Sequence, residues 1–499
     1  MHVHPVLQNG DILPEIFQHL SPERCGSGHS TLARAALVCK AFSDYALNVL
    51  WEEYPPLMAL VKMLPQSTSN VHSGEDAQAA VTKCSQNEWF HFDVYAERIR
   101  KLSVSAKEEI PILRILPFLF SRARDVPLFL SLVSLEFDQF LRRPHEYFIL
   151  FLSPSLRYFS HSIHDHSLRT VAGEARLDSV LDVLQAKAPF LQNLACYGVT
   201  NPTSLPSLTR LKGLQYLDLP RMTVFQVLSY CAELPQLKRL HTALREDLGG
   251  TGRIFPSRDF VALQSLSVSG AVSDMTGLLT AISSPNLHSF TVLQFMPQLG
   301  FGHVCRGFIQ TLVSRFGQSL RHVHLQCDFV FCADPGNHPI FRFVDVARPL
   351  LSLRHLELLV LCFYQACATV TYHEFEEMAS SWPMLEELTL RFGMMPPPVS
   401  GLAAFARHCP KLTRLAMFPM DLAVMPKREP YSVSHHNLRG LTIENLEYTA
   451  PEPHQLAHFI DCTFPQLDAS QVQINQQGSD WLVFVEERDA RRASTQGAL

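Results

Sequence analysis

Charged residues, long apolar runs and catalytic motifs are all scarce in this sequence of 499 residues. Only 18% of the residues are charged, and 42 Lys and Arg stand against 47 Asp and Glu. The net charge of -5 lacks the basic excess with which general nucleic-acid binders displace counterions. No apolar stretch reaches the roughly 20 residues that a membrane span needs, and the first residues show no signal-peptide pattern. We therefore expect no nucleic-acid partner and no membrane association.

Motifs that carry known catalytic chemistry are also missing. The sequence contains no G-x-x-x-x-G-K-[ST], no G-x-G-x-x-G, no G-x-S-x-G and no H-E-x-x-H. The chain therefore has no recognisable phosphate-binding loop, nucleophile elbow or zinc-protease helix. We expect a protein that is not an enzyme and that needs no cofactor.

The 12 cysteines are spread over a long chain without a secretion signal, and they indicate reduced thiols in a cytosolic or nuclear protein. One arrangement has the residue types that bind zinc: Cys327, Cys332, Cys362 and Cys367 in two C-x4-C pairs, with His322 and His324 close by. Cys327 and Cys362 follow predicted strands, however, where buried thiols act as small apolar fillers. We expect the cysteines to be structural and free of metal.

Leucine is the commonest residue, with 71 positions, and it recurs in an ordered way. A unit of the form L-x-x-L-x-L repeats with a mean spacing of about 28 residues, close to the period of leucine-rich repeats. The units begin at Ile99, Leu132, Leu156, Leu191, Leu214, Leu237, Leu263, Leu287, Leu320, Leu353, Leu385, Leu412, Leu438 and, in degenerate form, Leu467. The sequence thus predicts a repeat array over residues 89–470, followed by a C-terminal cap and tail over 471–499.

Within each unit the hydrophobic period changes from that of a strand to that of a helix. The fourth and sixth positions are apolar, as in a short strand with one buried face, and helical spacing follows in many units. Proline stands two residues before the first leucine in seven units, where it ends the helix: Pro154, Pro189, Pro235, Pro285, Pro383, Pro410 and Pro465. The fold class predicted is an α/β solenoid with parallel strands on the concave side and helices on the convex side. A generic doubly wound α/β protein is the alternative.

Residues 9–54 differ from the repeats and predict a small all-α module, which a polar linker over 55–88 separates from the first repeat. Apolar residues at helical spacing run through this module. In chain order the pattern is L-P-x-E-I, then a leucine four residues later, then L-x-x-x-x-x-V-C-K-x-F, and finally L-W. These positions are Leu13, Pro14, Glu15, Ile16, Leu20, Leu32, Val38, Cys39, Lys40, Phe42, Leu50 and Trp51. This pattern resembles the F-box, and the whole chain resembles the leucine-rich-repeat F-box proteins of mushroom-forming fungi.

The resemblance implies that the chain is the substrate receptor of an SCF-type cullin–RING ubiquitin ligase. Its partners would be the Skp adaptor, with cullin beyond it, and an unknown protein substrate. The residues that the resemblance assigns to adaptor docking are Leu13, Pro14, Ile16, Leu20, Leu32, Val38, Phe42 and Trp51. Two alternatives remain: a helical cap that seals the first repeat, and a leucine-rich-repeat scaffold without a ligase role.

Strand geometry predicts where the substrate binds. If the fourth and sixth positions of a unit point into the core, the third, fifth and seventh point outward. Applied from Leu320 to Phe418, this rule exposes a mixed charged and aromatic strip suited to protein recognition. The substrate-binding residues predicted are His322, His324, His355, Glu357, Arg391, Arg414 and Phe418.

Overall fold

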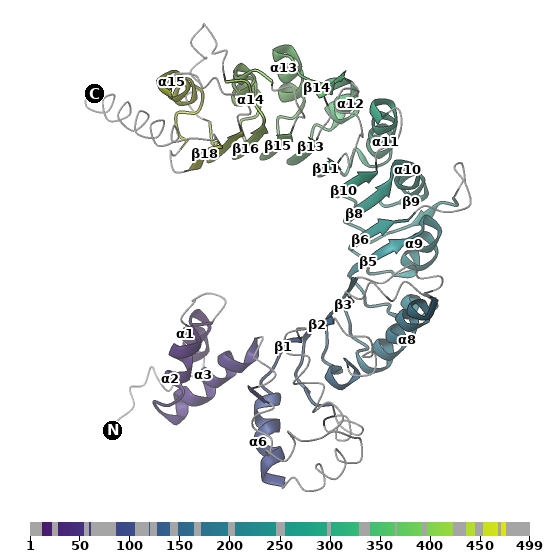
Figure 1. Ribbon diagram of the computed structural model, residues 1–499, viewed down its shortest axis with the longest axis vertical. Coiled ribbons are helices and arrows are strands. Elements are labelled where there is room, and N and C mark those ends of the chain that lie inside the picture. Colours follow the sequence, from purple (N-terminus) through teal and green to yellow (C-terminus); the bar gives the residue numbers. More distant parts are fainter. Residues whose placement is uncertain are drawn as a thin grey trace, which may run out of the picture. The chain divides into compact units, whose positions relative to one another are not determined.

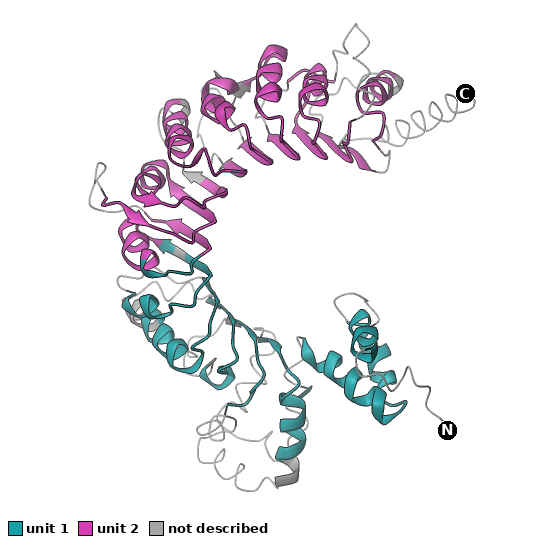
Figure 2. Ribbon diagram, turned by 180° about the vertical axis from the view of Figure 1, so that it is seen from behind, with its two compact units in different colours: residues 1–221, 233–237 teal, residues 222–232, 238–499 magenta. Residues whose placement is uncertain are grey.

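A computed structural model gives the fold, and its described residues fall in seventeen segments. These are 12–21, 28–53, 59–60, 86–104, 119, 127–139, 148–163, 171–197, 205–245, 255–296, 301–328, 340–364, 367–391, 397–422, 436–444, 453–467 and 471–475. Most of the predicted linker and the C-terminal tail lie outside these segments. The chain divides into two compact units, residues 1–221 with 233–237 and residues 222–232 with 238–499 (Figure 2).

Unit 1 contains the N-terminal helices and the first strands. The helices are α1 (Ile12–His19), α2 (Gly28–Ala35), α3 (Lys40–Glu52), α6 (Gln86–Ala96) and α8 (Val171–Lys187), with the short 3-10 helices η3 (Phe148–Phe151) and η5 (Pro206–Arg210). The strands are β1 (Lys101–Val104), β2 (Ser134–Gln139), β3 (Tyr158–Ile163), β4 (Asn193–Tyr197) and β5 (Tyr216–Met222). They follow one another in the sheet in chain order, and each pair is parallel.

Unit 2 continues the same alternation of strand and helix. Its main strands are β6 (Arg239–Leu244), β8 (Ser265–Ala271), β10 (Ser289–Met296), β11 (His322–Asp328), β13 (Leu358–Tyr364), β15 (Glu387–Arg391), β16 (Arg414–Phe418), β17 (Gly440–Glu444) and β18 (Val472–Asn475). Its helices are α9 (Val224–Tyr230), α10 (Val272–Ala281), α11 (Phe301–Phe316), α12 (Phe343–Ala347), α13 (Tyr372–Ser381), α14 (Leu402–His408) and α15 (Pro453–Thr463). Three short 3-10 helices adjoin these helices: η6 (Cys231–Glu233), η7 (Arg348–Ser352) and η8 (Val399–Gly401). Unit 2 also contains two short pairs of parallel strands. They are β7 (Arg258–Asp259) with β9 (Ile282–Ser283), and β12 (Ile340–Arg342) with β14 (Cys367–Thr369). In Figure 1 the helices α10 to α15 lie on one side of these strands, so the predicted α/β solenoid is confirmed.

A ladder of buried apolar side chains explains why the repeats stack. Within each compact unit, one buried residue of each main strand pairs in register with its counterpart on the next strand, and in most repeats it is the fourth residue of the L-x-x-L-x-L pattern. In unit 1 this ladder is Leu102, Leu135, Phe159, Leu194 and Leu217. In unit 2 it is Leu240, Leu266, Phe290, Val323, Leu359, Leu388, Leu415, Leu441 and Val472. Each repeat therefore buries its apolar face only by stacking on its neighbours.

Polar side chains at the turns before the strands connect consecutive repeats. Ser284 Oγ donates to Leu263 O at 2.7 Å, and Ser319 Oγ donates to Leu287 O at 2.7 Å. In a later repeat, Trp382 Nε1 donates to Leu350 O of the preceding repeat at 3.0 Å. The seven prolines counted in the sequence lie at these turns, between the preceding helix or loop and the strand that follows. These bonds satisfy carbonyl groups at the turns between repeats.

Two helices of unit 2 begin with capping boxes, in which two side chains satisfy free amides at a helix start. Thr223 accepts from the amide of Gln226 at the start of α9, and Gln226 Oε1 accepts from the amide of Thr223. Thr371 and Glu374 make the same exchange at the start of α13. Since each box orients the first helical turn, it also fixes the exit from the preceding strand or loop.

The repeat frame predicted from Leu353 is wrong. The strand register pairs Val323 with Leu359, so the unit starts at Leu356 instead. Both frames fit L-x-x-L-x-L, because leucine occupies all three required positions whether the unit begins at Leu353 or at Leu356. The turn that follows η7 places the frame from Leu356 on the sheet. Leu359, predicted to face outward, is therefore fully buried. The degenerate last unit is also displaced, since Val472, the sixth residue counted from Leu467 and not the fourth, pairs with Leu441.

Candidate interaction surfaces

The three N-terminal helices form a module with a core of its own. Leu13 and Phe17 of α1 pack against Leu32 of α2 and against Ala46 and Val49 of α3, and all five are buried. The spacing of four between Leu13 and Phe17 places both on one face of α1. The predicted docking residues Leu13 and Leu32 thus lie inside the module, at 2% and 0% exposure.

Other apolar residues of the module face solvent. Leu37 is 87% exposed and Val38 is 67% exposed, in the turn that follows α2. Ile16 on α1 is 46% exposed. Of the eight residues predicted to dock the adaptor, Ile16 and Val38 are therefore the two large aliphatic side chains that the structure leaves available, and Leu37 is an exposed neighbour that the motif did not single out.

The remaining predicted docking residues are partly buried within unit 1. The Phe42 ring meets Phe17 edge-on at 5.4 Å, and Leu20 packs on the same core. Trp51, near the end of α3, lies 4.9 Å from the ring of Tyr95 on α6. Pro14, Asp44 and Arg98 are among the residues that line a cleft of about 570 Å³ between α3 and the segment after α6.

The end of α3 is attached directly to the first repeat. The amide of Arg100 donates to Glu52 O at 3.0 Å. The backbones of Glu53 and Lys101 form an isolated parallel β-bridge, as the residues of adjacent strands do. The Arg98 guanidinium donates to Asp44 O at 3.1 Å and lies 3.3 Å from the Asp44 carboxylate. These contacts join α3 to β1 and extend the edge of the sheet, while most of the predicted linker over 55–88 lies outside the described residues.

The strand face of unit 2, meaning the outward side chains of β11, β13, β15 and β16, contains most of the predicted substrate-binding residues. Three contacts involve them: His322 Nε2 lies 3.4 Å from Oε2 of Glu357, which the shifted frame places just before β13, Arg414 is ion-paired with Glu387, and the Arg391 guanidinium lies over the Phe418 ring at 5.2 Å. These pairs connect neighbouring repeats.

Two predicted residues of unit 2 differ from this pattern. His355 is exposed in the turn before β13, because the repeat frame begins three residues later than predicted. His324 lies between Thr291 and Val360 of the adjoining strands. Burial among these uncharged neighbours lowers the pKa of His324 below its ordinary 6.5.

The strand face of unit 1, meaning the outward side chains of β2 to β5, carries a tyrosine and carboxylate cluster that the sequence analysis missed. Tyr158 and Tyr216 occupy equivalent positions on β3 and β5, on either side of a β4 residue. The Tyr216 hydroxyl donates to Asp218 Oδ2 at 3.3 Å. Tyr197 is 40% exposed beside them, whereas Asp218 is only 4% exposed although it points to the same face. The outward-position rule used for the later repeats would have found all four residues.

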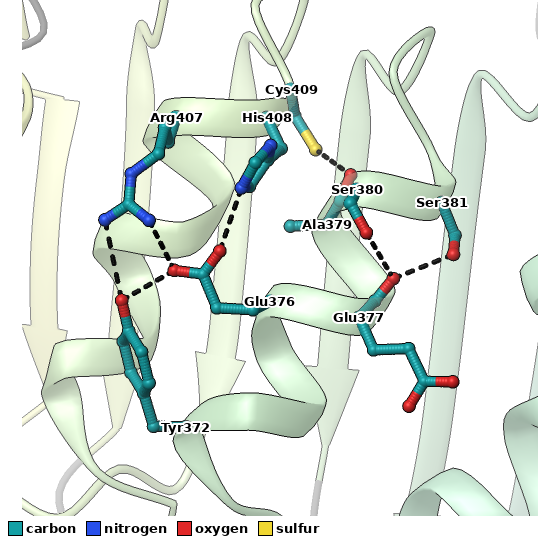
Figure 3. Close-up of polar contacts among 9 residues, drawn as sticks. All are labelled: Tyr372, Glu376, Glu377, Ala379, Ser380, Ser381, Arg407, His408 and Cys409. Carbon is teal, nitrogen blue, oxygen red and sulfur yellow. Dashed lines mark hydrogen bonds and ion pairs between the residues drawn. The ribbon is translucent and has the colours of Figure 1, made fainter.

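The helix side of unit 2 holds a polar network centred on Glu376, between α13 and α14 (Figure 3). Its carboxylate accepts from the Tyr372 hydroxyl at 2.6 Å, pairs with Arg407 Nη1 at 2.6 Å and lies 2.8 Å from His408 Nε2. Burial alone would raise the pKa of Glu376, but the hydrogen bonds from Tyr372 and His408 and the adjacent Arg407 charge lower it below 4.5. Nearby, Cys409 Sγ donates to Ala379 O at 3.5 Å. These contacts join α13 and α14.

Three buried thiols of the repeats, those of Cys196, Cys231 and Cys409, are protonated at neutral pH. Burial raises the pKa of Cys196, Cys231 and Cys409 to about 12 in each case. Among the residues that the structure describes, no group of three or more His, Cys, Asp and Glu is placed to hold a metal ion. Cys332 of the zinc-like pattern lies outside them. Within the same described segments, no helix combines the length and apolar character needed to cross a membrane.

Comparison with solved structures finds leucine-rich-repeat proteins at low identity. An internalin of Listeria monocytogenes is 13% identical, with 85% of this chain and 96% of that chain covered and a TM-score of 0.32. A leucine-rich repeat-containing protein of Legionella pneumophila is 12% identical, covering 71% of this chain and 96% of that chain, with a TM-score of 0.35. A leucine-rich-repeat protein of Leptospira interrogans is 15% identical, covering 85% and 100%, with a TM-score of 0.32. No protein-family model and no curated protein matches the sequence, so the repeat fold rests on the chain's own strand ladder.

Proposed function

We propose that this protein is a non-catalytic substrate receptor of an SCF-type ubiquitin ligase, working in the cytosol or nucleus. The N-terminal module would dock the Skp adaptor, with cullin beyond it, and the strand faces of the repeats would hold a target protein. Holding the target beside the ligase makes ubiquitin transfer effectively intramolecular, which raises its rate without new chemistry in this chain.

The exposed apolar residues of the module are the observation that supports adaptor docking. The module already has a closed core, yet Leu37 and Val38 are 87% and 67% exposed. Fully burying such an aliphatic side chain is worth roughly 1.5–3 kcal/mol, so a partner that covered both would gain that binding energy. The F-box-like motif runs through this same turn, at Val38, Cys39 and Lys40.

Adaptor binding by a matched pair of variants tests the proposal. Leu37→Asp combined with Val38→Asp should abolish co-purification of a recombinant Skp adaptor, because two charges would enter the interface. Val261→Asp is the control, since Val261 is 68% exposed on unit 2, and it should retain the adaptor. Leu13→Asp is less informative because Leu13 is in the core, where the charge would disrupt the helices themselves. Full adaptor binding by the double variant would exclude this docking surface.

A leucine-rich-repeat scaffold without a ligase role is the second candidate. The contacts of Glu52 and Glu53 with Arg100 and Lys101 favour it, because they are what a helical cap makes at the edge of the first strand. A cap needs no exposed docking residues. Failure of the unaltered chain to bind any Skp adaptor, together with unfolding of the first repeats when residues 9–54 are removed, would favour the scaffold.

A further inference from the structure

The tyrosine and carboxylate cluster on the strand face of unit 1 consists of Tyr158, Tyr197, Tyr216, Asp218 and Glu136. Strand register fixes the relation of four of these residues. Tyr158 and Tyr216 occupy the same row of the sheet on β3 and β5, and Glu136 and Asp218 occupy the row two residues further along, on β2 and β5. Tyr197, at the end of β4, lies close enough for its hydroxyl to hydrogen-bond Asp218.

The cluster generates a negative local field. Burial raises the pKa of Tyr158, and the carboxylates of Glu136 and Asp218 raise it further. Burial likewise raises the pKa of Tyr197, with additional effects of the Asp218 charge and hydrogen bond. Burial opposes any charge at this place, whereas the negative charges of Glu136 and Asp218, which raise these pKa values further, would attract a cation.

The chemistry of these side chains matches a guanidinium group. Tyrosine rings attract cations to their faces, hydroxyl and carboxylate oxygens accept hydrogen bonds, and the planar arginine head can use both at once. The chain itself uses this geometry elsewhere: the Arg157 guanidinium lies over the Phe190 ring at 4.9 Å, and Arg391 lies over Phe418 at 5.2 Å. Phosphate groups of a nucleic acid would be repelled by the two carboxylates.

We propose that the strand face of unit 1 binds an arginine side chain from an extended segment of a partner protein, with Tyr197 as the exposed aromatic contact. Tyr158 and Tyr216 would flank the guanidinium, and Glu136 and Asp218 would supply the complementary charge. This site goes beyond adaptor docking and does not depend on it. It would make unit 1 a second recognition surface, in addition to the strip on unit 2.

A peptide titration of the full-length protein tests this site. The probe is a fluorescein-labelled nine-residue Gly-Ser peptide with arginine at every third position, followed by fluorescence anisotropy. We expect Tyr197→Ala to weaken binding by about five- to thirtyfold, the range of a desolvated cation–π contact, and Glu136→Gln to weaken it by several-fold. Tyr197→Phe keeps the ring and should bind within about threefold of the parent. Phe90→Ala is the matched control, because Phe90 is an exposed aromatic residue of the same unit on α6, and binding should not change.

Several outcomes would overturn the site. They are no binding of the arginine peptide at about 1 mM protein, equal binding of a matched glutamate peptide, and stronger binding of a labelled oligouridylate. The site would also be overturned if both Tyr197→Ala and Glu136→Gln bound the arginine peptide with unchanged affinity. A loss of affinity in Phe90→Ala equal to that in Tyr197→Ala would overturn it as well. Skp adaptor co-purification is measured on the same variants and should be retained in each, so that failure here is distinct from failure of adaptor docking.

Discussion

The two strand faces of this chain share one construction and differ in chemistry. In both units the inward residues form the same buried ladder, such as Leu194 with Leu217 in unit 1 and Leu388 with Leu415 in unit 2. The outward residues diverge: unit 1 presents tyrosines around carboxylates, whereas unit 2 presents His–Glu and Arg–Glu pairs and an Arg–Phe contact. Inward positions therefore determine the fold, and outward positions are free to determine what each face binds.

The largest expected effect comes from breaking the ladder, at two adjacent leucines of β13. Leu359 is fully buried, whereas Leu358 is partly exposed on the outward side. We expect Leu359→Ala to lower the free energy of unfolding by about 2–5 kcal/mol, as for other buried leucines, and Leu358→Ala to cost less than half as much. Chemical denaturation of the two variants measures this difference. The reverse order would restore the frame that begins at Leu353.

The next effect concerns the helix side of unit 2, where Glu376 connects Tyr372, Arg407 and His408. At pH 7 we expect Glu376→Gln to lower the free energy of unfolding by about 1 kcal/mol, because the group is paired but not fully buried. The folded-state pKa of Glu376 lies below 4.5, so its stabilisation is complete above that pH and is lost as the pH falls through the folded-state value. Denaturation from about pH 6 to about pH 3 should therefore show a steeper loss in the parent than in the variant. Parallel curves would contradict this role.

The outward pairs of unit 2 should matter for binding more than for stability. A variant with Glu357, Arg391 and Phe418 all replaced by alanine should lose no more than about 1–2 kcal/mol in unfolding, since exposed pairs contribute little. In a pull-down it should keep the Skp adaptor and lose captured target proteins. Tyr197→Ala is the comparison from unit 1, and we expect it to lose a different subset of the captured proteins. Identical captures by the parent and the triple variant would place target binding elsewhere.

Repetition explains how much of the fold was predictable. Errors in one repeat are corrected by the others, so leucine spacing and the prolines at the turns were enough to predict parallel strands backed by helices. The unit at Leu353 was an exception because leucines fit two frames, and only packing against Val323 chooses between them. The contact between Glu52 and Arg100 was equally invisible, because it joins residues far apart in the chain through backbone atoms that no motif encodes.

The candidate surfaces were harder to predict than the fold. An amphipathic stripe shows which residues are apolar but not which of them meet within the module, so Leu13 and Val38 looked alike although one is 2% and the other 67% exposed. The cluster around Tyr197 was missed for a different reason. The outward-position rule was applied only from Leu320 to Phe418, whereas the cluster lies on β2 to β5, in the earlier repeats.

The smallest expected effect is a pH dependence confined to unit 2, at His324. Burial beside uncharged residues lowers its folded-state pKa below 6.5, so the unfolded chain binds a proton at a higher pH than the folded one. Stability should therefore fall as the pH drops below 6.5, until the folded-state pKa is passed. His324→Gln should reduce the loss of unfolding free energy between about pH 7 and about pH 5 by a few tenths of a kcal/mol or more. His355→Gln is the control, because His355 is exposed in a turn, and its curve should follow that of the parent. If the His324 variant also follows the parent, burial does not lower the pKa of His324. The outward face of β11 is then more open to solvent than the side chains on the neighbouring strands imply.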